Sequence, residues 1–234
     1  MPLRTRRHSS ERLLVLLGLG LASALSVGLE LVRELHYGDP GFRFLLWNLT
    51  LAWIPLVVAL VVYDCYRRGA GLLVLSPAIA LWLIFLPNAP YIVTDFVHLE
   101  PRGVPLWFDG ALLSAFAQTG VLLGFVSLYL MHAVVRDRFG VPAGWLFALG
   151  ALPLTSAGMY VGRFLQWNSW DVLVRPGQLL AQVAARVDQA TVVHAAGLTL
   201  LLTALLAATY LAFYTLVGLR VDPQRSGPLS TRRS

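Results

Sequence analysis

The stretch FLPNAPYIVTDFVHL, from Phe85 to Leu99, interrupts an otherwise apolar run of the chain. Pro87 cannot donate a backbone hydrogen bond, and Pro90 biases the residue before it away from the helical conformation. A helix that arrives from the preceding run is therefore expected to break here. The polar residues that follow, above all Asp95 and His98, make this break the first candidate for a functional site.

The composition indicates that the chain is built for a lipid environment. Of its 234 residues, 57% are hydrophobic and only 13% are charged, and the mean hydropathy is +0.69. A soluble domain carries about 25% charged residues. The apolar residues also occur in runs long enough to cross about 30 Å of hydrocarbon as helices. No segment is polar enough to form a separate soluble domain.

We predict an all-α integral membrane bundle of about six transmembrane helices with two short interfacial or re-entrant segments on its outer face. The basic N-terminus covers 1–12, the membrane domain 13–219, and a basic, disordered tail 220–234. The predicted spans are 13–32, 44–63, 71–86, 111–135, 141–162 and 192–219. The first span also resembles a signal peptide, with an A-x-A cleavage pattern after its most apolar part. Its apolar character continues to Val32, so we favour a retained helix and leave cleavage as the alternative.

The basic residues predict the orientation of the chain. All 18 are arginines, and 12 of them fall in the two termini and in the loops after the second and fourth spans. By the positive-inside rule these regions are cytoplasmic, with both termini inside. Short arginine clusters between apolar runs are typical of juxtamembrane charges, which argues against a nucleic-acid partner despite a pI near 10.0. The expected partner is the lipid bilayer, and a membrane-protein partner or a homo-oligomer stays open.

Two polar segments are predicted to lie at the outer membrane surface. If the helix restarts after the prolines, Tyr91, Asp95, His98 and Arg102 share one face, which indicates an amphipathic segment that lies at the interface or dips back into the membrane. Asn88 is a candidate either to cap this segment or to hydrogen-bond the broken backbone.

The second polar segment, GRFLQWNSWDVL, follows the fifth span from Gly162 to Leu173. Asn168 and Asp171 have the spacing of a capping box. Arg163 offers a guanidinium that can hold a phosphate or a carboxylate through two hydrogen bonds. Residues 178–189 then alternate between an apolar and a polar helical face, which predicts a second interfacial helix.

The same motifs carry a family resemblance. FLPNAPYIVTDFVHL, with WNLTLAWIPL before it and RFLQWNSWD after it, resembles the bacterial multi-pass membrane family called domain of unknown function 1361. The resemblance extends over roughly residues 44 to 219. It implies an integral protein of the bacterial cytoplasmic (inner) membrane. The family carries no settled activity, so the resemblance implies no substrate, and the cofactor stays unknown.

The outer polar residues have two chemical interpretations. A metal site needs three or four ligands, and Asp95 with His98 supplies only one carboxylate–histidine pair, so we predict no metal. The single Cys65 excludes an internal disulfide and a cysteine-cluster metal site. In an enzyme acting on a lipid-linked or periplasmic substrate, the catalytic candidates are Asp95, His98 and Asp171. The substrate-binding candidates are Asn88, Tyr91, Arg163 and Asn168.

Two further interpretations are not catalytic. A transporter places broken helices and ionisable groups near the middle of the membrane, whereas the predicted break lies at the end of a span. We favour a structural or partner-binding membrane subunit, in which ion pairs such as Asp95–Arg163 or Asp171–Arg102 hold the two outer segments together. Whether the protein is an enzyme stays undecided at this point.

Three expectations concern side chains outside the two polar segments. Glu30 is expected to extend outward to water from the end of the first span. His132 is expected to be solvated at the cytoplasmic end of the fourth span. Gly20, Ala24 and Gly28 form a small-residue stripe that predicts close packing of the first span against a neighbour.

Overall fold

The computed structural model describes residues 2–101, 103–167, 174–175, 177–178, 181 and 189–218. The helical elements in these residues are α1 (Pro2–Tyr37), α2 (Phe44–Arg67), α3 (Leu72–Phe85), α4 (Asn88–Tyr91), the 3-10 helix η1 (Ile92–His98), α5 (Leu106–Phe139), α6 (Val141–Phe164) and α9 (Gln189–Gly218). No β-strand occurs within this described part of the chain. The predicted all-α class is therefore confirmed.

Six helical segments are long and apolar enough to cross a membrane. They are Ser10–Tyr37, Phe44–Arg67, Leu72–His98, Leu106–Phe139, Val141–Phe164 and Val193–Gly218. The predicted number of spans is confirmed. The third segment differs from the expected span 71–86, because its apolar helical path continues through the proline break as far as His98.

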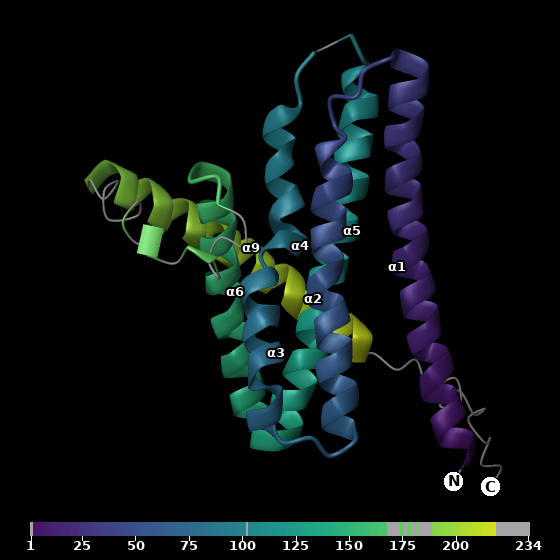
Figure 1. Ribbon diagram of the computed structural model, residues 1–234, viewed down its shortest axis with the longest axis vertical. Coiled ribbons are helices and arrows are strands. Elements are labelled where there is room, and N and C mark those ends of the chain that lie inside the picture. The colour runs from purple at the N-terminus through teal and green to yellow at the C-terminus, as the bar shows by residue number, and fades with distance from the viewer. Residues whose placement is uncertain are drawn as a thin grey trace, which may run out of the picture.

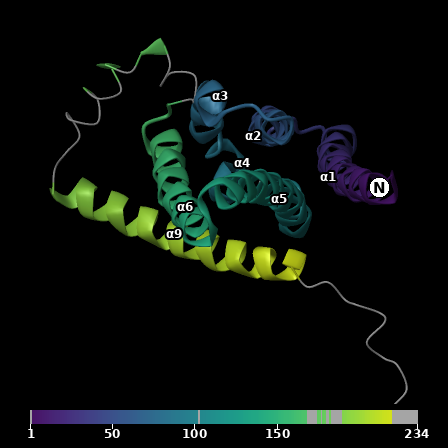
Figure 2. The same cartoon turned by 90° about the horizontal axis from the view of Figure 1, so that it is seen from below.

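The helix α5 is the central element of the bundle (Figures 1 and 2). It packs against α2 and α6, while α1 lies at one edge and α9 crosses obliquely behind α6 and α5. Within the most apolar window of each helix, 61% of α5 is buried inside the protein, against 17% of α1 and 11% of α9. The two peripheral helices therefore turn most of their apolar surface outward, as helices in contact with lipid do.

Buried side chains form two clusters that both include residues of α5. The first joins α1, α2, η1 and the first half of α5, and its most buried members include Leu45, Ala52, Leu56, Ile92, Leu112 and Phe116. The second joins α2, α3, α5, α6 and α9, and its most buried members include Ala59, Val62, Trp82, Leu128, Ala148 and Tyr210. Residues of α5 therefore contribute to both apolar cores of the molecule.

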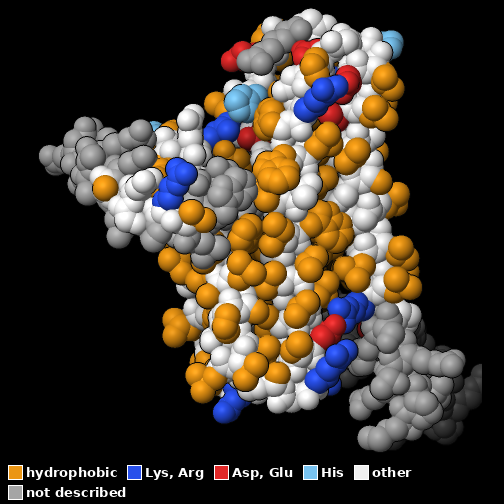
Figure 3. Space-filling view, viewed as in Figure 1, with side chains coloured by type: hydrophobic (Ala, Val, Ile, Leu, Met, Phe, Trp, Pro, Cys, Tyr) orange, Lys and Arg blue, Asp and Glu red, His pale blue; other side chains and the backbone are white. Residues whose placement is uncertain are grey.

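Charged side chains gather towards the two ends of the bundle, and the surface between them is mainly apolar on the face shown in Figure 3. We refer to the end that holds residues 38–43, 99–101 and 103–105 as the upper end, and to the end that holds residues 68–71 and Gly140 as the lower end (top and bottom in Figure 1).

Two ion pairs of α1 mark the limits of the apolar zone. Arg12 pairs with Asp64 at the lower end, at 2.7 Å, and Arg33 pairs with Asp109 at the upper end, at 2.8 Å. At a rise of 1.5 Å per residue, the two arginines lie about 32 Å apart along the helix. This spacing matches the hydrocarbon thickness of a bilayer, about 30 Å.

The proline break lies between the two ends, where glycines on two neighbouring helices leave room for it (Figure 1). A Cβ atom added to Gly120 of α5 would lie 2.3 Å from the carbonyl oxygen of Ala89. A Cβ atom added to Gly158 of α6 would lie 2.5 Å from Cγ of Pro87. Each of these glycines is followed by another glycine four positions later, the spacing that lets membrane helices approach closely.

The small-residue stripe predicted on the first span does not make the expected close contact. A Cβ atom added to Gly20 or Gly28 would meet no described atom within 4 Å. The buried face of α1 instead contains Leu19, Ser26 and Arg33, so the two glycines lie on other faces of the helix.

We expect Gly120→Ala to lower the free energy of unfolding by about 1–3 kcal/mol, because the new methyl group meets a backbone carbonyl that cannot rotate away. The matched control is Gly110→Ala on the same helix, where an added Cβ meets no described atom within 4 Å. The control is expected to be neutral or slightly stabilising, since alanine favours helix over glycine. Thermal unfolding in detergent micelles compares the two variants. Equal melting temperatures would contradict the close approach of α4 and α5.

Candidate functional site

The polar cluster at the upper part of the bundle is centred on Asp95. The short 3-10 helix η1 turns this side chain inward, where it is 1% exposed. Nδ2 of Asn48 donates to one carboxylate oxygen at 3.0 Å, and a guanidinium nitrogen of Arg163 donates to the other at 3.2 Å. Both oxygens of the buried carboxylate are therefore hydrogen-bonded.

Three separate helical segments supply this cluster. Asn48 lies in the second turn of α2, and Arg163 lies at the end of α6. A second guanidinium nitrogen of Arg163 donates to the backbone oxygen of Thr94 at 2.9 Å. Arg163 thus binds both a side chain and the backbone of η1, which ties the upper half of the broken span to α6.

The ion pair is asymmetric in its exposure. The Asp95 side chain is 1% exposed and the Arg163 side chain is 17% exposed. An ionised carboxylate buried at this depth is costly unless a cation and additional hydrogen bonds compensate it. Arg163 supplies the charge, and Asn48 supplies the additional hydrogen bond.

The predicted residues Asn88 and Tyr91 serve the backbone and the packing of the break. Nδ2 of Asn88 donates to the carbonyl oxygen of Phe85 at 3.0 Å, so the amide bonds the backbone at the end of α3 and does not cap the segment that follows. The Tyr91 ring packs against α6, because a Cβ atom added to Gly162 would lie 3.1 Å from its Cε2 atom. The backbone carbonyl oxygen of Tyr91 accepts a hydrogen bond from Thr94 Oγ1 at 2.7 Å.

His98 lies at the end of η1 and is partly buried. Its ring meets the Phe44 ring edge-on, with 5.2 Å between centroids. Among the described residues, no group of three His, Cys, Asp or Glu side chains lies close enough together to hold a metal ion. The remaining predicted residues, Arg102, Asn168 and Asp171, lie outside the described residues, as does most of the second interfacial helix predicted for 178–189.

The surface helix predicted after the prolines differs from the observed structure. Tyr91, Asp95 and His98 were expected on one water-facing side of an α-helix, but residues Ile92–His98 form a 3-10 helix in which Asp95 is buried. The expectation treated polar residues as facing water. Here Asn48 and Arg163 replace the water, so the carboxylate is buried inside the bundle.

Sequence reasoning did not select Asn48 as a partner of Asp95. The available signal was an amide side chain inside a strongly apolar run, since a polar group in that position needs an internal partner.

A second charged cluster at the upper end was also missed by sequence reasoning. Arg33 donates to both carboxylate oxygens of Asp109, at 2.8 and 3.2 Å, and to the carboxylate and backbone oxygen of Asp39. Its guanidinium carbon lies 4.3 Å from the centre of the Phe42 ring. Glu30 lies one turn away on α1 and is 2% exposed, so the expectation that it extends to water is wrong. Its helix face packs into the bundle instead.

The lower end holds a buried histidine. His132 is 1% exposed, its Nδ1 atom lies 3.1 Å from the hydroxyl oxygen of Tyr210, and its ring stacks on Tyr214 with 5.1 Å between centroids. Trp145 of α6 meets the same ring edge-on. The expected solvated histidine is therefore wrong, because α9 crosses this part of α5 and its two tyrosines cover the imidazole.

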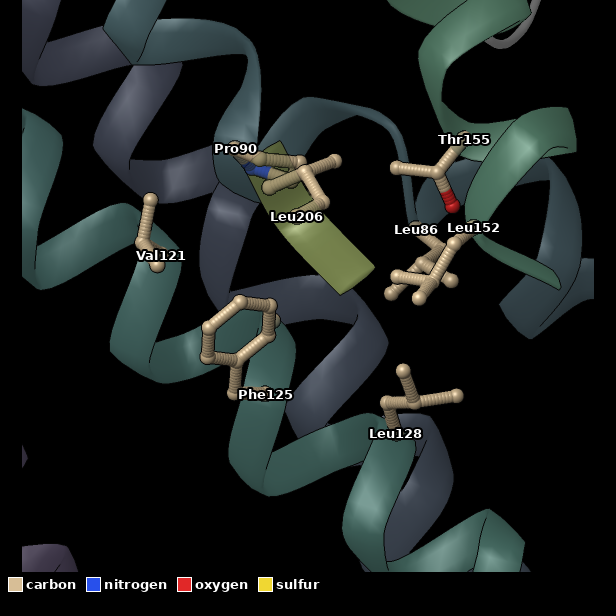
Figure 4. Close-up of a pocket in the computed structure, with 9 residues that line it drawn as sticks. Leu86, Pro90, Val121, Phe125, Leu128, Leu152, Thr155 and Leu206 are labelled. Carbon is tan, nitrogen blue, oxygen red and sulfur yellow. The ribbon is translucent and has the colours of Figure 1, made fainter. Parts of the chain in front are cut away.

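A small apolar pocket lies beside the proline break (Figure 4). It has a volume of ≈ 10 Å³, and its lining includes Pro90 of α4, Phe125 of α5, Thr155 of α6 and Leu206 of α9. The Thr155 hydroxyl donates to the carbonyl oxygen of Ala151 at 2.8 Å, so it is already satisfied. A space of this size and character holds at most a single water molecule.

We expect Arg163→Gln to destabilise the protein by about 3 kcal/mol or more, because it leaves the Asp95 carboxylate buried without a cation. Combining it with Asp95→Asn is expected to restore part of the loss, with a coupling of about 0.5–3 kcal/mol. Thermal or denaturant unfolding of the two single variants and the double variant measures this coupling. Arg43→Gln, at the exposed pair with Glu34, is the control and is expected to change little. Additive effects of the Asp95 and Arg163 substitutions would contradict a direct pair.

Comparison with known protein families matches residues 47–206 to a family described as "Protein of unknown function (DUF1361)". The matched region contains Asn48, the proline break, Asp95 and Arg163, and therefore the whole polar cluster. No curated protein and no solved structure matches the chain. Since the family match covers more than half of the 234 residues, the resemblance seen in the sequence is confirmed and the chain belongs to the DUF1361 family.

Proposed function

We propose that the protein is a structural or partner-binding subunit of the bacterial cytoplasmic membrane, whose polar cluster at the upper end holds its helices in register. The six apolar helices and the family match make it a membrane protein of a family of unknown function. The more specific role rests on how the protein uses Asp95.

The observation that carries the proposal is the complete engagement of the Asp95 carboxylate. One oxygen accepts from Asn48 and the other from Arg163, and the side chain is 1% exposed. A general base must present an oxygen to the proton that it removes. A carboxylate that is buried and bonded at both oxygens is suited to joining helices. Removing the Asp95 carboxylate is therefore expected to lower the stability of the protein, and any loss of function is expected to follow from that loss of stability.

A membrane enzyme acting on a lipid-linked or periplasmic substrate at the same face is the second candidate. Its support is the residual exposure of Arg163, 17% of the side chain, next to the partly buried His98 on η1. A guanidinium at the level of the lipid headgroups is suited to binding a phosphate through two hydrogen bonds. In that case Arg163 would exchange Asp95 for the substrate anion.

A transporter receives some support from the position of the break. The break meets α5 at Gly120, through the carbonyl oxygen of Ala89, and broken helices inside a membrane mark substrate sites in transporters. The pocket beside the break is, however, ≈ 10 Å³ in volume and apolar in its lining. We therefore rank transport below the first two candidates.

Phenotype and protein amount, measured together, separate the structural role from the catalytic one. Asp95→Asn and His98→Ala are introduced into a strain that lacks the native protein. We expect the Asp95 variant to lose function only in proportion to the protein that is lost from the membrane, and the His98 variant to retain function. If either variant fails to rescue the deletion strain although its amount in the membrane and its melting temperature equal those of the wild type, the catalytic role is favoured instead.

We further propose that the upper end faces the periplasm and that both chain termini are cytoplasmic. The proposal is supported by the excess of arginine in the termini and the lower-end loops. In a Cys65→Ser background, a membrane-impermeant maleimide is expected to label Glu100→Cys in intact cells and Arg68→Cys only after permeabilisation. Both native side chains are exposed, so access alone does not separate them. The opposite labelling pattern would reverse the orientation.

A further inference from the structure

The contact between α1 and α5 contains a line of buried polar groups, which we call the polar seam. Ser26 Oγ of α1 lies 3.3 Å from Thr119 Oγ1 of α5, and both residues are buried. Glu30 follows one turn above Ser26, and Arg33 with its partner Asp109 completes the seam at the upper end. Charged and hydroxyl groups therefore lie where two membrane helices would ordinarily pack through apolar side chains.

Each guanidinium nitrogen of Arg33 donates to a partner other than Glu30. Its Nε atom donates to Asp109, its two terminal nitrogens donate to the backbone and carboxylate oxygens of Asp39, and one of them also donates to Asp109. The nearest cation on α1 therefore offers Glu30 no hydrogen bond, although the two residues are only three positions apart.

Glu30 is the unsatisfied member of the seam. Both of its carboxylate oxygens are buried and have no hydrogen-bond partner among the described residues, and the residue is 2% exposed. The position is about 4.5 Å further into the apolar zone than Arg33, at 1.5 Å per residue. An ionised carboxylate without a partner is among the most costly groups to bury in an apolar interior.

Acids outnumber arginines among the charged groups around Glu30. The charged groups that act on Glu30 are Arg33 and Glu34 of α1, Asp39 of the following loop and Asp109 of α5, and Arg43 at the start of α2 also interacts with it. Three of these five are acids. Both arginines already have acidic partners, Arg33 with Asp39 and Asp109, and Arg43 with Glu34. An ionised Glu30 would thus be an excess negative charge.

We propose that Glu30 is a proton-binding site, and that its neutral, protonated form keeps α1 docked against α5. The proton comes from the aqueous phase at the upper end and returns to it, so the step needs no other reactant. Loss of the proton leaves an unpaired carboxylate inside the seam, which favours separation of α1 from α5. Since only 17% of the apolar window of α1 is buried, the helix has little apolar contact to oppose that separation.

Infrared spectroscopy of the full-length protein in phosphatidylethanolamine–phosphatidylglycerol bilayers tests the protonation state. At neutral pH, we expect a carbonyl band of a protonated carboxylic acid that shifts when the protein is made with heavy-carbon glutamate. The band is expected to be absent from Glu30→Gln and present in the matched control Glu34→Gln, which alters an exposed pair on the same helix.

Two results would overturn the assignment. One is the lack of a glutamate-dependent band at neutral pH, which is also the result expected if Glu30 is ionised and binds a metal cation. The other is a band that persists in Glu30→Gln. If that variant does not fold, the labelled wild type alone decides, because Glu11 and Glu100 are exposed and Glu34 is paired with Arg43. All four glutamates lie in the described part of the chain, and Glu30 is the one with a buried side chain.

The pH dependence of the melting temperature tests whether the Glu30 proton keeps α1 docked against α5. The group is neutral in the folded state and ionised when exposed to water, so its contribution to stability is lost as the pH rises. The melting temperature of the wild type and of Glu34→Gln is expected to fall on alkaline titration, and that of Glu30→Gln to fall less. Parallel decreases in all three proteins would overturn the link between the Glu30 proton and the docking of α1.

Discussion

A carboxylate placed in an apolar interior must be paired with a cation and hydrogen-bonded, and Asp95 meets both conditions at the point where α2, α6 and η1 come together. The pairing involves few side chains, but it connects α2, α6 and η1. Arg163 holds the side chain of Asp95 and the backbone of Thr94, and Asn48 extends the network to α2. Without this network the upper half of the broken span would leave a buried charge unpaired.

The break itself is possible because the neighbouring helices are shaped to receive it. Pro87 follows the end of α3, and the single turn of α4, which contains Pro90, precedes η1. The carbonyl of Ala89 then approaches α5 where Gly120 has no side chain, and Pro87 approaches α6 where Gly158 has none. The prolines and the glycines lie in different helices, but each requires the other, since any side chain at the glycines would collide with the broken segment.

Buried polar groups need partners, and the same rule accounts for the ion pairs of Arg12 and Arg33 near the two ends of α1. Glu30, which lies between these two arginines, is the exception. Arg12 and Arg33 reach acids at the two limits of the apolar zone. Glu30 lies inside that zone without a hydrogen bond from the described residues. The cluster around Asp95 therefore satisfies its own buried carboxylate, whereas the polar seam requires a proton on Glu30.

Much of the fold follows from the sequence, because hydrocarbon thickness and helix rise leave few alternatives for long apolar runs. The six spans were predicted in this way. The break followed from the backbone chemistry of Pro87 and Pro90, and the possible Asp95–Arg163 pair followed from the need of polar groups near lipid for a partner. The burial of Asp95, Glu30 and His132 was not predicted. The burial of each of these side chains depends on which helix covers it. A sequence pattern shows which residues share one face of a helix, but it does not show which neighbouring helix packs against that face.

The glycine contacts also depend on the neighbouring helix, which the sequence pattern does not identify. The stripe of Gly20 and Gly28 on α1 has the spacing of a packing motif but meets no described atom within 4 Å. Gly120 and Gly158, which do receive the break, were not singled out by spacing alone. Local sequence can therefore show that close packing is possible, whereas the path of the third span decides where it occurs.

Backbone hydrogen–deuterium exchange in residues 92–98, compared between the wild type and Arg163→Gln, tests most directly whether the Asp95–Arg163 pair holds the upper half of the broken span. We predict slow exchange in this segment of the wild type and markedly faster exchange in the variant, with residues 72–85 of α3 unchanged. Equal exchange of residues 92–98 in the two proteins would contradict it.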